Sequence, residues 1–255
     1  MDERTISAPG AEHLPPAGAS AQRAKAPGVT GEGDSPLDDP RVLQILSTEH
    51  WSLLSQRSLV YNESFARAGM FLTFLSASLV ALAFVANAMA FDRTFLVLAS
   101  TLLTVDLVIG LATVGRMLDT SVDDVRAIAG MNRIRNAYVQ IAPAVQPFLI
   151  TSIHDDAAGA LESYGARPVR PGIGTILHGL TTASGMIGVI DAVLAAAIAG
   201  VLAVLVGLSL GIVLAAGGIA FVVAFAAITR YAISIVVDFQ EHVVSRFPTP
   251  PGART

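Results

Sequence analysis

Two aspartates lie within long apolar stretches of this 255-residue chain, where a charged side chain is unusual. Asp106 interrupts the run 94–115, and Asp191 interrupts the run 182–206. A charge at the centre of a bilayer costs roughly 2.5–3.5 kcal/mol on insertion scales, so such residues face protein or water, and they often carry protons or ions. The two positions are therefore a candidate intramembrane polar site.

The two aspartates are expected at the same depth in the membrane. Asp106 lies nine residues inside Gly115, and Asp191 lies nine residues inside Thr182. Two carboxylates that lie close together share a proton or bind a cation. The alternative interpretation is two protonated acids that hold helices together. Hydroxyl groups at similar depth are possible hydrogen-bond partners: Ser76, Ser78, Thr101 and Thr104.

A second candidate surface lies in segment 131–138, which reads Met-Asn-Arg-Ile-Arg-Asn-Ala-Tyr. Tyr138 belongs to the apolar stripe of a predicted helix, whereas Arg133 and Arg135 point elsewhere. These guanidinium groups could bind lipid headgroups, a nucleotide or carboxylates of a neighbouring subunit. A solvated helix face is the alternative.

Metal or catalytic chemistry has little support in the sequence. Asp238, Glu241 and His242 have the i, i+3, i+4 spacing of metal ligands in helix bundles, and Glu49-His50 could approach them. Solvated charge near a membrane surface explains these residues more simply, and a loop turn explains His154-Asp155-Asp156. The chain has no Cys, no phosphate-binding glycine loop and no zinc-protease signature. We expect no metal, no cofactor and no enzymatic activity.

Four apolar runs must position these side chains. Hydrophobic residues make up 53% of the chain, charged residues only 14%, and the mean hydropathy is +0.62. From Ala192 to Thr229, 38 residues pass without an acidic or basic side chain, nearly twice the roughly 20 residues that cross a bilayer. This run predicts two helices folded back on each other at 207–211. The sequence predicts an all-α integral membrane protein with spans at 68–88, 94–115, 182–206 and 210–230, arranged as two hairpins.

Helical extensions are expected outside the first hairpin, in a unit that covers residues 38–150. Asp39-Pro40 predicts a helix start, and this helix continues without a breaker into the first span. Beyond the second span, apolar residues recur every three or four positions up to Ile141, after which Pro143 and Pro147 end the helix. Antiparallel packing of the two extensions would bury both stripes and form a two-helix stalk. The stripe of the first extension is Leu46, Leu53 and Val60, and that of the second includes Ile134.

The remaining segments are polar or rich in Pro and Gly. Residues 1–37 and 248–255 are predicted to be disordered, and residues 151–180 to form an irregular loop. The second unit, 181–247, consists of the second hairpin and a short tail helix, 231–247.

The basic residues predict the orientation. With four spans, both termini lie on one side, which holds 15 of the 16 Lys and Arg residues, and only Arg93 lies opposite. The positive-inside rule makes that side the cytoplasm, and the Arg- and Ala-rich composition points to a bacterial inner membrane. No nucleic-acid-binding patch stands out, so the expected partner is the lipid bilayer.

The stretch from Glu49 to Ile141 consists of a helix, a span, a tight turn, a span and a long helix that ends in Asn-Arg-Ile-Arg-Asn-Ala-Tyr. In this architecture it resembles uncharacterised multi-pass proteins of actinobacteria. It is more loosely similar to the two-span SLATT-type effectors of bacterial defence systems, a resemblance that implies pore formation. The second hairpin departs from the SLATT pattern, and the resemblance transfers no site residues.

Two functions from different classes are therefore open. The first is a non-enzymatic, oligomeric inner-membrane protein, either a scaffold or a pore-former, with its stalk stripe at subunit contacts. The second is a small proton- or cation-coupled transporter built around Asp106 and Asp191.

Overall fold

The computed structural model describes residues 37, 39–164, 179, 181–242 and 244–251. All of them belong to one compact unit, Pro36–Thr255. The predicted disorder of residues 1–36 and 252–255, the first residue of the predicted unit 38–150, and the part of the predicted loop at 165–178 and 180 lie outside the described residues.

The first hairpin consists of two very long helices, α1 (Pro40–Met89) and α2 (Arg93–Ile141). The Asp39 side chain accepts a hydrogen bond from the backbone N of Arg41 at 2.9 Å, and Pro40 begins α1, as predicted. The connecting turn is tight, with Ala90 and Phe91 in the left-handed region at φ 49° and 59°. Asp92 then caps α2 by accepting from the backbone N of Phe95 at 2.8 Å.

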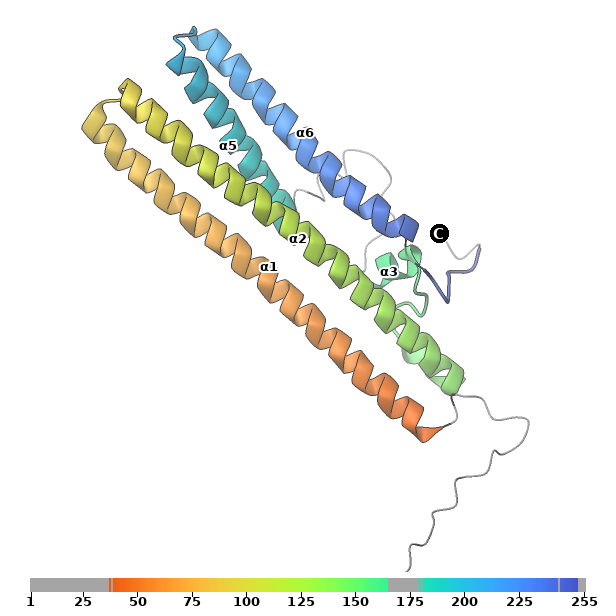
Figure 1. Cartoon of the computed structure of the whole chain (residues 1–255). Helices are drawn as coiled ribbons and strands as arrows, with labels where there is room; N and C mark the ends of the chain where they lie inside the picture. The colour runs from red at the N-terminus through yellow and green to blue at the C-terminus, as the bar shows by residue number, and fades with distance from the viewer. Residues whose placement is uncertain (1–36, 38, 165–178, 180, 243, 252–255) are drawn as a thin grey trace, which may run out of the picture. The chain divides into compact units, whose positions relative to one another are not determined.

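The second hairpin consists of α5 (Ala183–Leu205) and α6 (Leu210–His242), joined at Gly207 with φ 76°. Helix α5 packs against both α2 and α6, so α2 and α5 are the inner elements and α1 and α6 the outer ones. Figure 1 shows α1 and α2 side by side, with α5 and α6 on the other side of α2. The predicted span and tail helix at the C-terminal end form one helix that ends at His242 rather than at 247.

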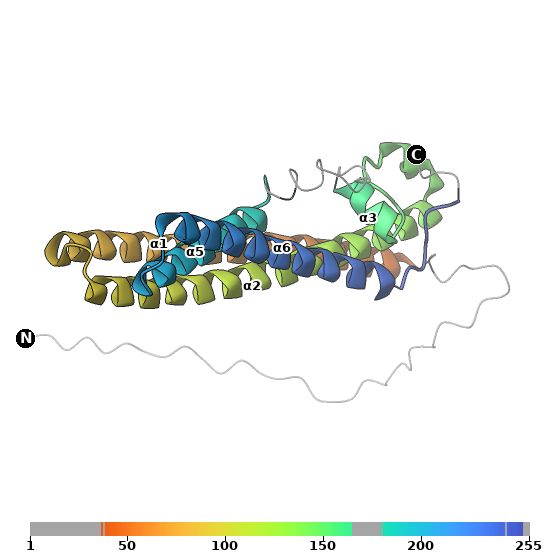
Figure 2. The same ribbon diagram turned by 90° about the horizontal axis from the view of Figure 1, so that it is seen from above.

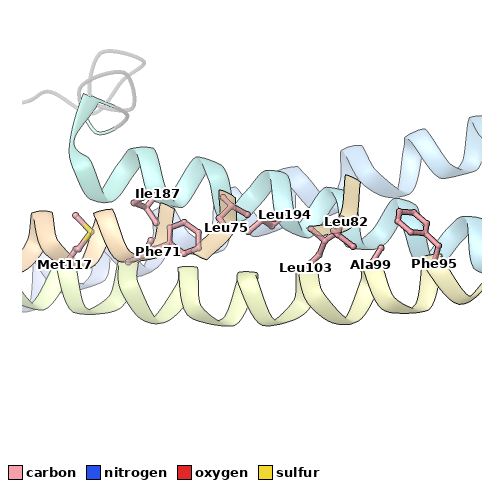
Figure 3. Close-up of a cluster of buried hydrophobic side chains, with 10 residues drawn as sticks. Phe71, Leu75, Leu82, Phe95, Ala99, Leu103, Met117, Ile187 and Leu194 are labelled. Carbon is pink, nitrogen blue, oxygen red and sulfur yellow. The ribbon is translucent and has the colours of Figure 1, made fainter. Parts of the chain in front are cut away.

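All four long helices are long and apolar enough to cross a membrane, which confirms the predicted multi-pass all-α architecture. Buried side chains of α1, α2 and α5 form a common apolar core in the span region, shown in Figure 3. None of the described residues of α6 is buried, in contrast to those of α5.

The stalk also forms as predicted. Outside the predicted spans, α1 and α2 pack antiparallel, and a hydrogen bond of 2.9 Å joins the hydroxyls of Ser64 and Thr120. Gly130 of α2 lies against Leu53 of α1, where an added Cβ would meet the Leu53 side chain at 3.0 Å. Ile134 is buried inside the chain, so the prediction that this stripe meets a second subunit is wrong for Ile134.

Two short helices follow α2: η1 (Pro143–Phe148), which precedes the predicted loop, and α3 (Ala157–Ser163), which lies within the segment 151–180 predicted as an irregular loop. The Asp156 side chain caps α3 by accepting from the backbone N of Gly159 at 2.9 Å. Ala160 packs with Ile128 and Met131 of α2. Figures 1 and 2 place α3 near the end of α2 that is remote from the α1–α2 turn. Seven residues are too few for a periodic signal, so α3 depends on this packing and on its cap.

Candidate functional site

Asp106 is fully buried in the core between the long helices. Its Oδ1 accepts a hydrogen bond from the Ser78 hydroxyl of α1 at 3.0 Å. Its Oδ2 is buried and has no hydrogen-bond partner. One of the four hydroxyls suggested by sequence therefore meets this carboxyl group, and one oxygen remains for another ligand or a proton.

Asp191 of α5 is also fully buried, and neither of its carboxyl oxygens has a hydrogen-bond partner. The carboxyl group lies directly against Gly110 of α2, where an added Cβ would overlap Oδ1. Phe71 of α1 closes the same space, with its Cε2 at 3.0 Å from that Cβ position. Gly110 thus provides the room that lets this carboxyl group approach the backbone of α2.

Gly110 follows Asp106 by four residues, so both lie on one face of α2, one turn apart. Asp106 and the point at which Asp191 of α5 meets α2 therefore lie on the same face of α2. Together the two aspartates present three buried carboxyl oxygens without a partner. Figure 3 shows the apolar core of the same helices, in which Leu103 and Ile187 lie about one turn before Asp106 and Asp191 in sequence. Buried polar atoms are nearly always paired, and an unpaired ionised carboxylate in an apolar interior is strongly unfavourable. The arrangement is suited to holding protons or a small cation.

The other three hydroxyls suggested by sequence do not reach this cluster. Ser76 is exposed and donates to the backbone O of Leu72 at 2.7 Å. Thr101 and Thr104 likewise donate to backbone oxygens of their own helix, at 2.9 and 2.6 Å. Two residues along a helix is a rotation of about 200°, which explains why Ser78 faces the core and Ser76 does not.

The stalk contains a buried ion pair that the sequence reasoning missed. Arg57 Nε donates to Asp124 Oδ1 at 2.5 Å, and the hydroxyls of Tyr61 and Tyr164 donate to Oδ2 of the same carboxylate. Burial, followed by the hydrogen bond to Asp124, raises the pKa of Tyr164. The available signal was Arg57 itself, a charge in the apolar stripe between Leu53 and Val60. This pair joins α1, α2 and the end of α3.

The candidate surface at 131–138 is engaged within the chain. Arg133 Nε donates to Asp155 Oδ2 at 2.8 Å. Fully buried Asn132 donates to the backbone O of His154 and Gly159 at 2.8 and 3.1 Å and accepts from Arg135 at 2.7 Å. This segment of α2 is therefore an anchoring surface for residues 152–163.

Asp155 attaches the C-terminal segment, residues 244–249, to this part of α2. It accepts from the Ser245 hydroxyl at 2.6 Å, from the backbone N of Arg246 at 3.1 Å and from the backbone N of Phe247 at 2.7 Å. Burial raises the pKa of Asp155, but these hydrogen bonds and the one from Arg133 outweigh burial and lower the pKa to about 2. Thr249 also donates to Asp156, through its hydroxyl at 2.7 Å. The prediction of disorder from residue 248 is therefore wrong at Thr249.

Tyr138 and His50 lie together between the stalk helices, with ring centroids 6.3 Å apart. Burial lowers the pKa of Arg135, with Arg57 adding to the effect, and burial and Arg135 lower the pKa of His50. His50 thus belongs to the α1–α2 contact rather than to a site with α6, and Glu49 is exposed. His242 forms an exposed ion pair with Asp238 at 3.2 Å. Within the described part of the chain, no three His, Asp or Glu residues are grouped to hold a metal.

Comparison of the chain with protein-family models, with curated proteins and with solved structures finds no match. The function must therefore be argued from the geometry of the chain itself.

Proposed function

We propose that this chain is a non-enzymatic, oligomeric protein of a bacterial inner membrane, with both termini in the cytoplasm, that acts as a scaffold or pore-former. The observation that carries the proposal is an apolar surface on α1 outside the predicted spans. Its side chains are Leu43, Trp51, Leu54 and Phe65, which are 50%, 65%, 42% and 65% exposed. Leu43, Leu54 and Phe65 follow each other at intervals of eleven residues, or about three helical turns. We call these four residues the outer α1 face.

A second apolar surface lies on α6 beyond its predicted span, at Ile233, Val236 and Val237. Large exposed apolar patches in water usually mark interaction sites. Because α1 and α6 are the two outer helices of the chain, contact of one copy's outer α1 face with the next copy's α6 leaves a free surface at each end. Head-to-tail contacts of this kind close into rings or extend as filaments. This geometry favours a second copy as the partner.

Charge placed on the outer α1 face is expected to dissociate the assembly. The double variant Trp51→Glu, Leu54→Glu puts two carboxylates into the proposed contact, where they lose hydration without gaining a partner. The measurement is native mass by light scattering, corrected for bound detergent. The wild-type protein is expected to give a defined oligomer and the double variant a smaller species.

Gln56→Glu is the control for added negative charge, because it places one carboxylate at an exposed position on another face of α1. It should retain the wild-type mass. A monomeric wild-type protein, or an oligomer that survives the double variant, would contradict the proposal.

A second function, proton- or cation-coupled transport, is favoured by one specific observation. Asp106 and Asp191 contribute three buried carboxyl oxygens that lack a partner, inside the three-helix core of the span region. Intramembrane carboxylates of this kind commonly relay protons or bind coupling ions.

Replacement of either carboxyl group by an amide is expected to abolish coupled flux, since an amide cannot release a proton or neutralise a cation. Asp106→Asn and Asp191→Asn are compared in proteoliposomes, with an internal pH dye and an imposed potassium diffusion potential to drive protons. An imposed sodium gradient tests the cation alternative. Ser76→Ala is the control, because Ser76 lies outside the cluster. Wild-type flux in folded Asp106→Asn and Asp191→Asn proteins would exclude this function.

A further inference from the structure

A pocket of about 660 Å³ lies between α2 and α6, just beyond the ends of their predicted spans. Its volume is within the range of small-ligand sites. Arg116, the first residue after the span 94–115, lies at one end of the α2 wall, and the α6 wall begins at Ser234, four residues beyond Arg230. The end of the pocket at Arg116 is thus at the expected depth of lipid headgroups. The charged residues that line it are Arg116, Asp119, Asp123, Arg126 and Asp238.

From these positions we infer that the pocket binds the headgroup of a zwitterionic aminophospholipid, one that carries a phosphate and a primary ammonium. Along α2 the charges run from the membrane outward as a cation, Arg116, and then an anion, Asp119. Three residues separate them, or roughly 4.5 Å along the helix axis. An aminophospholipid has the complementary order, with its phosphate next to the glycerol and its ammonium farther out.

The guanidinium groups have donors to spare for a phosphate. Arg116 uses Nε and Nη2 to bond Glu63 at 3.0 and 3.4 Å, and Arg126 uses Nη1 to bond Asp123 at 3.1 Å. Guanidinium groups match phosphate oxygens in geometry and charge. Glu63 holds Arg116 in place, so this side chain is partly pre-organised for an anion at the membrane surface.

The carboxylates select for the ammonium. Asp119 is exposed and makes no ion pair with any described residue, whereas Asp238 pairs with His242 at 3.2 Å. With three carboxylates and two guanidinium groups in its lining, the pocket carries a net charge of −1 (2 − 3). A purely anionic headgroup is repelled by this excess, whereas an ammonium group compensates it. Charge complementarity therefore points to the zwitterion.

Lipid binding is tested on the purified full-length chain by native mass spectrometry, with phosphatidylethanolamine and phosphatidylglycerol of identical acyl chains. Phosphatidylethanolamine is expected to be retained in preference. Asp119→Asn is expected to reduce that preference by about tenfold, the effect of one charged hydrogen bond. Arg116→Gln, which removes the guanidinium group proposed to bind the phosphate, is expected to weaken both lipids alike. Glu241→Gln is the control. Glu241 is an exposed carboxylate of α6 outside the pocket lining, so its replacement should leave the preference unchanged.

Asp119 makes no hydrogen bond or ion pair with any described residue, so Asp119→Asn is expected to melt at the wild-type temperature and to remain a valid test. Equal retention of both lipids, or an unchanged preference in Asp119→Asn, would overturn the inference. Displacement of the lipid by putrescine with the same sensitivity to Asp119→Asn would assign the pocket to a soluble diamine instead.

Discussion

Gly110→Ala adds only one methyl group, yet it is expected to destabilise the protein strongly. The new Cβ would overlap Oδ1 of Asp191 and also crowd Phe71, so α2 and α5 must move apart. Overpacking of this kind costs about 1–3 kcal/mol, even though Ala is otherwise the better helix former. Equilibrium unfolding of the detergent-solubilised protein, followed by circular dichroism, measures the loss.

Gly115→Ala is the matched control on the same helix, because an added Cβ there meets nothing within 4 Å. It should be neutral or slightly stabilising. Asp191→Ala removes the obstructing carboxyl group and should restore most of the stability lost in Gly110→Ala, which makes the pair a double-mutant cycle. Equal stability of Gly110→Ala and Gly115→Ala would show that the Asp191 carboxyl group does not lie against α2.

Asp155→Ala is expected to release the C-terminal segment from the end of α2. The change removes the acceptor for Arg133, Ser245 and two backbone N–H groups of residues 246 and 247. Loss of these bonds to a buried carboxylate costs about 2 kcal/mol. Hydrogen exchange of residues 244–249 should become fast, while α1 and α2 within the spans keep their protection.

Glu162→Ala is the control, since Glu162 is an exposed carboxylate on α3. It should leave the exchange of residues 244–249 slow. Slow exchange of these residues in Asp155→Ala would show that the segment is held by other contacts.

The pKa of Asp155 predicts how the attachment of the C-terminal segment depends on pH. The pKa of Asp155 is about 2 in the folded chain, below its ordinary value of 3.8, so the folded state favours the ionised form. Its contribution is therefore complete above about pH 4 and is lost as the pH falls toward 2. Between pH 5 and 8 the exchange of residues 244–249, corrected for the intrinsic rate, should be independent of the charge of Asp155.

Local signals in the sequence were sufficient for the four long helices, for the start of α1 and for the end of α2, but not for η1, α3 or the end of α6. Asp39-Pro40 begins α1, and Pro143 follows the end of α2 at Ile141. Each of these features depends on a few neighbouring residues or on length and hydropathy, which can be evaluated without knowing the partner. The same holds for the burial of Asp106 and Asp191, because an acid in an apolar run must avoid lipid.

Contacts between segments distant in the chain were decided by the tertiary structure. Periodicity shows which face of a helix is apolar, but it does not give the rotation and axial offset of one helix against another. Those two quantities determine that Asp191 lies against Gly110 and that Ser78, rather than Ser76, bonds Asp106. They also place Arg57 within hydrogen-bond distance of Asp124.

The attachment of the C-terminal segment depends on Asp155, 90 residues before Ser245 in the chain. Hydrogen bonds between short irregular segments leave no periodic pattern. The sequence by itself therefore determined a four-span membrane protein with a helical stalk. Only the tertiary structure decided which buried acids lack partners and which surfaces remain free for lipid or for another copy.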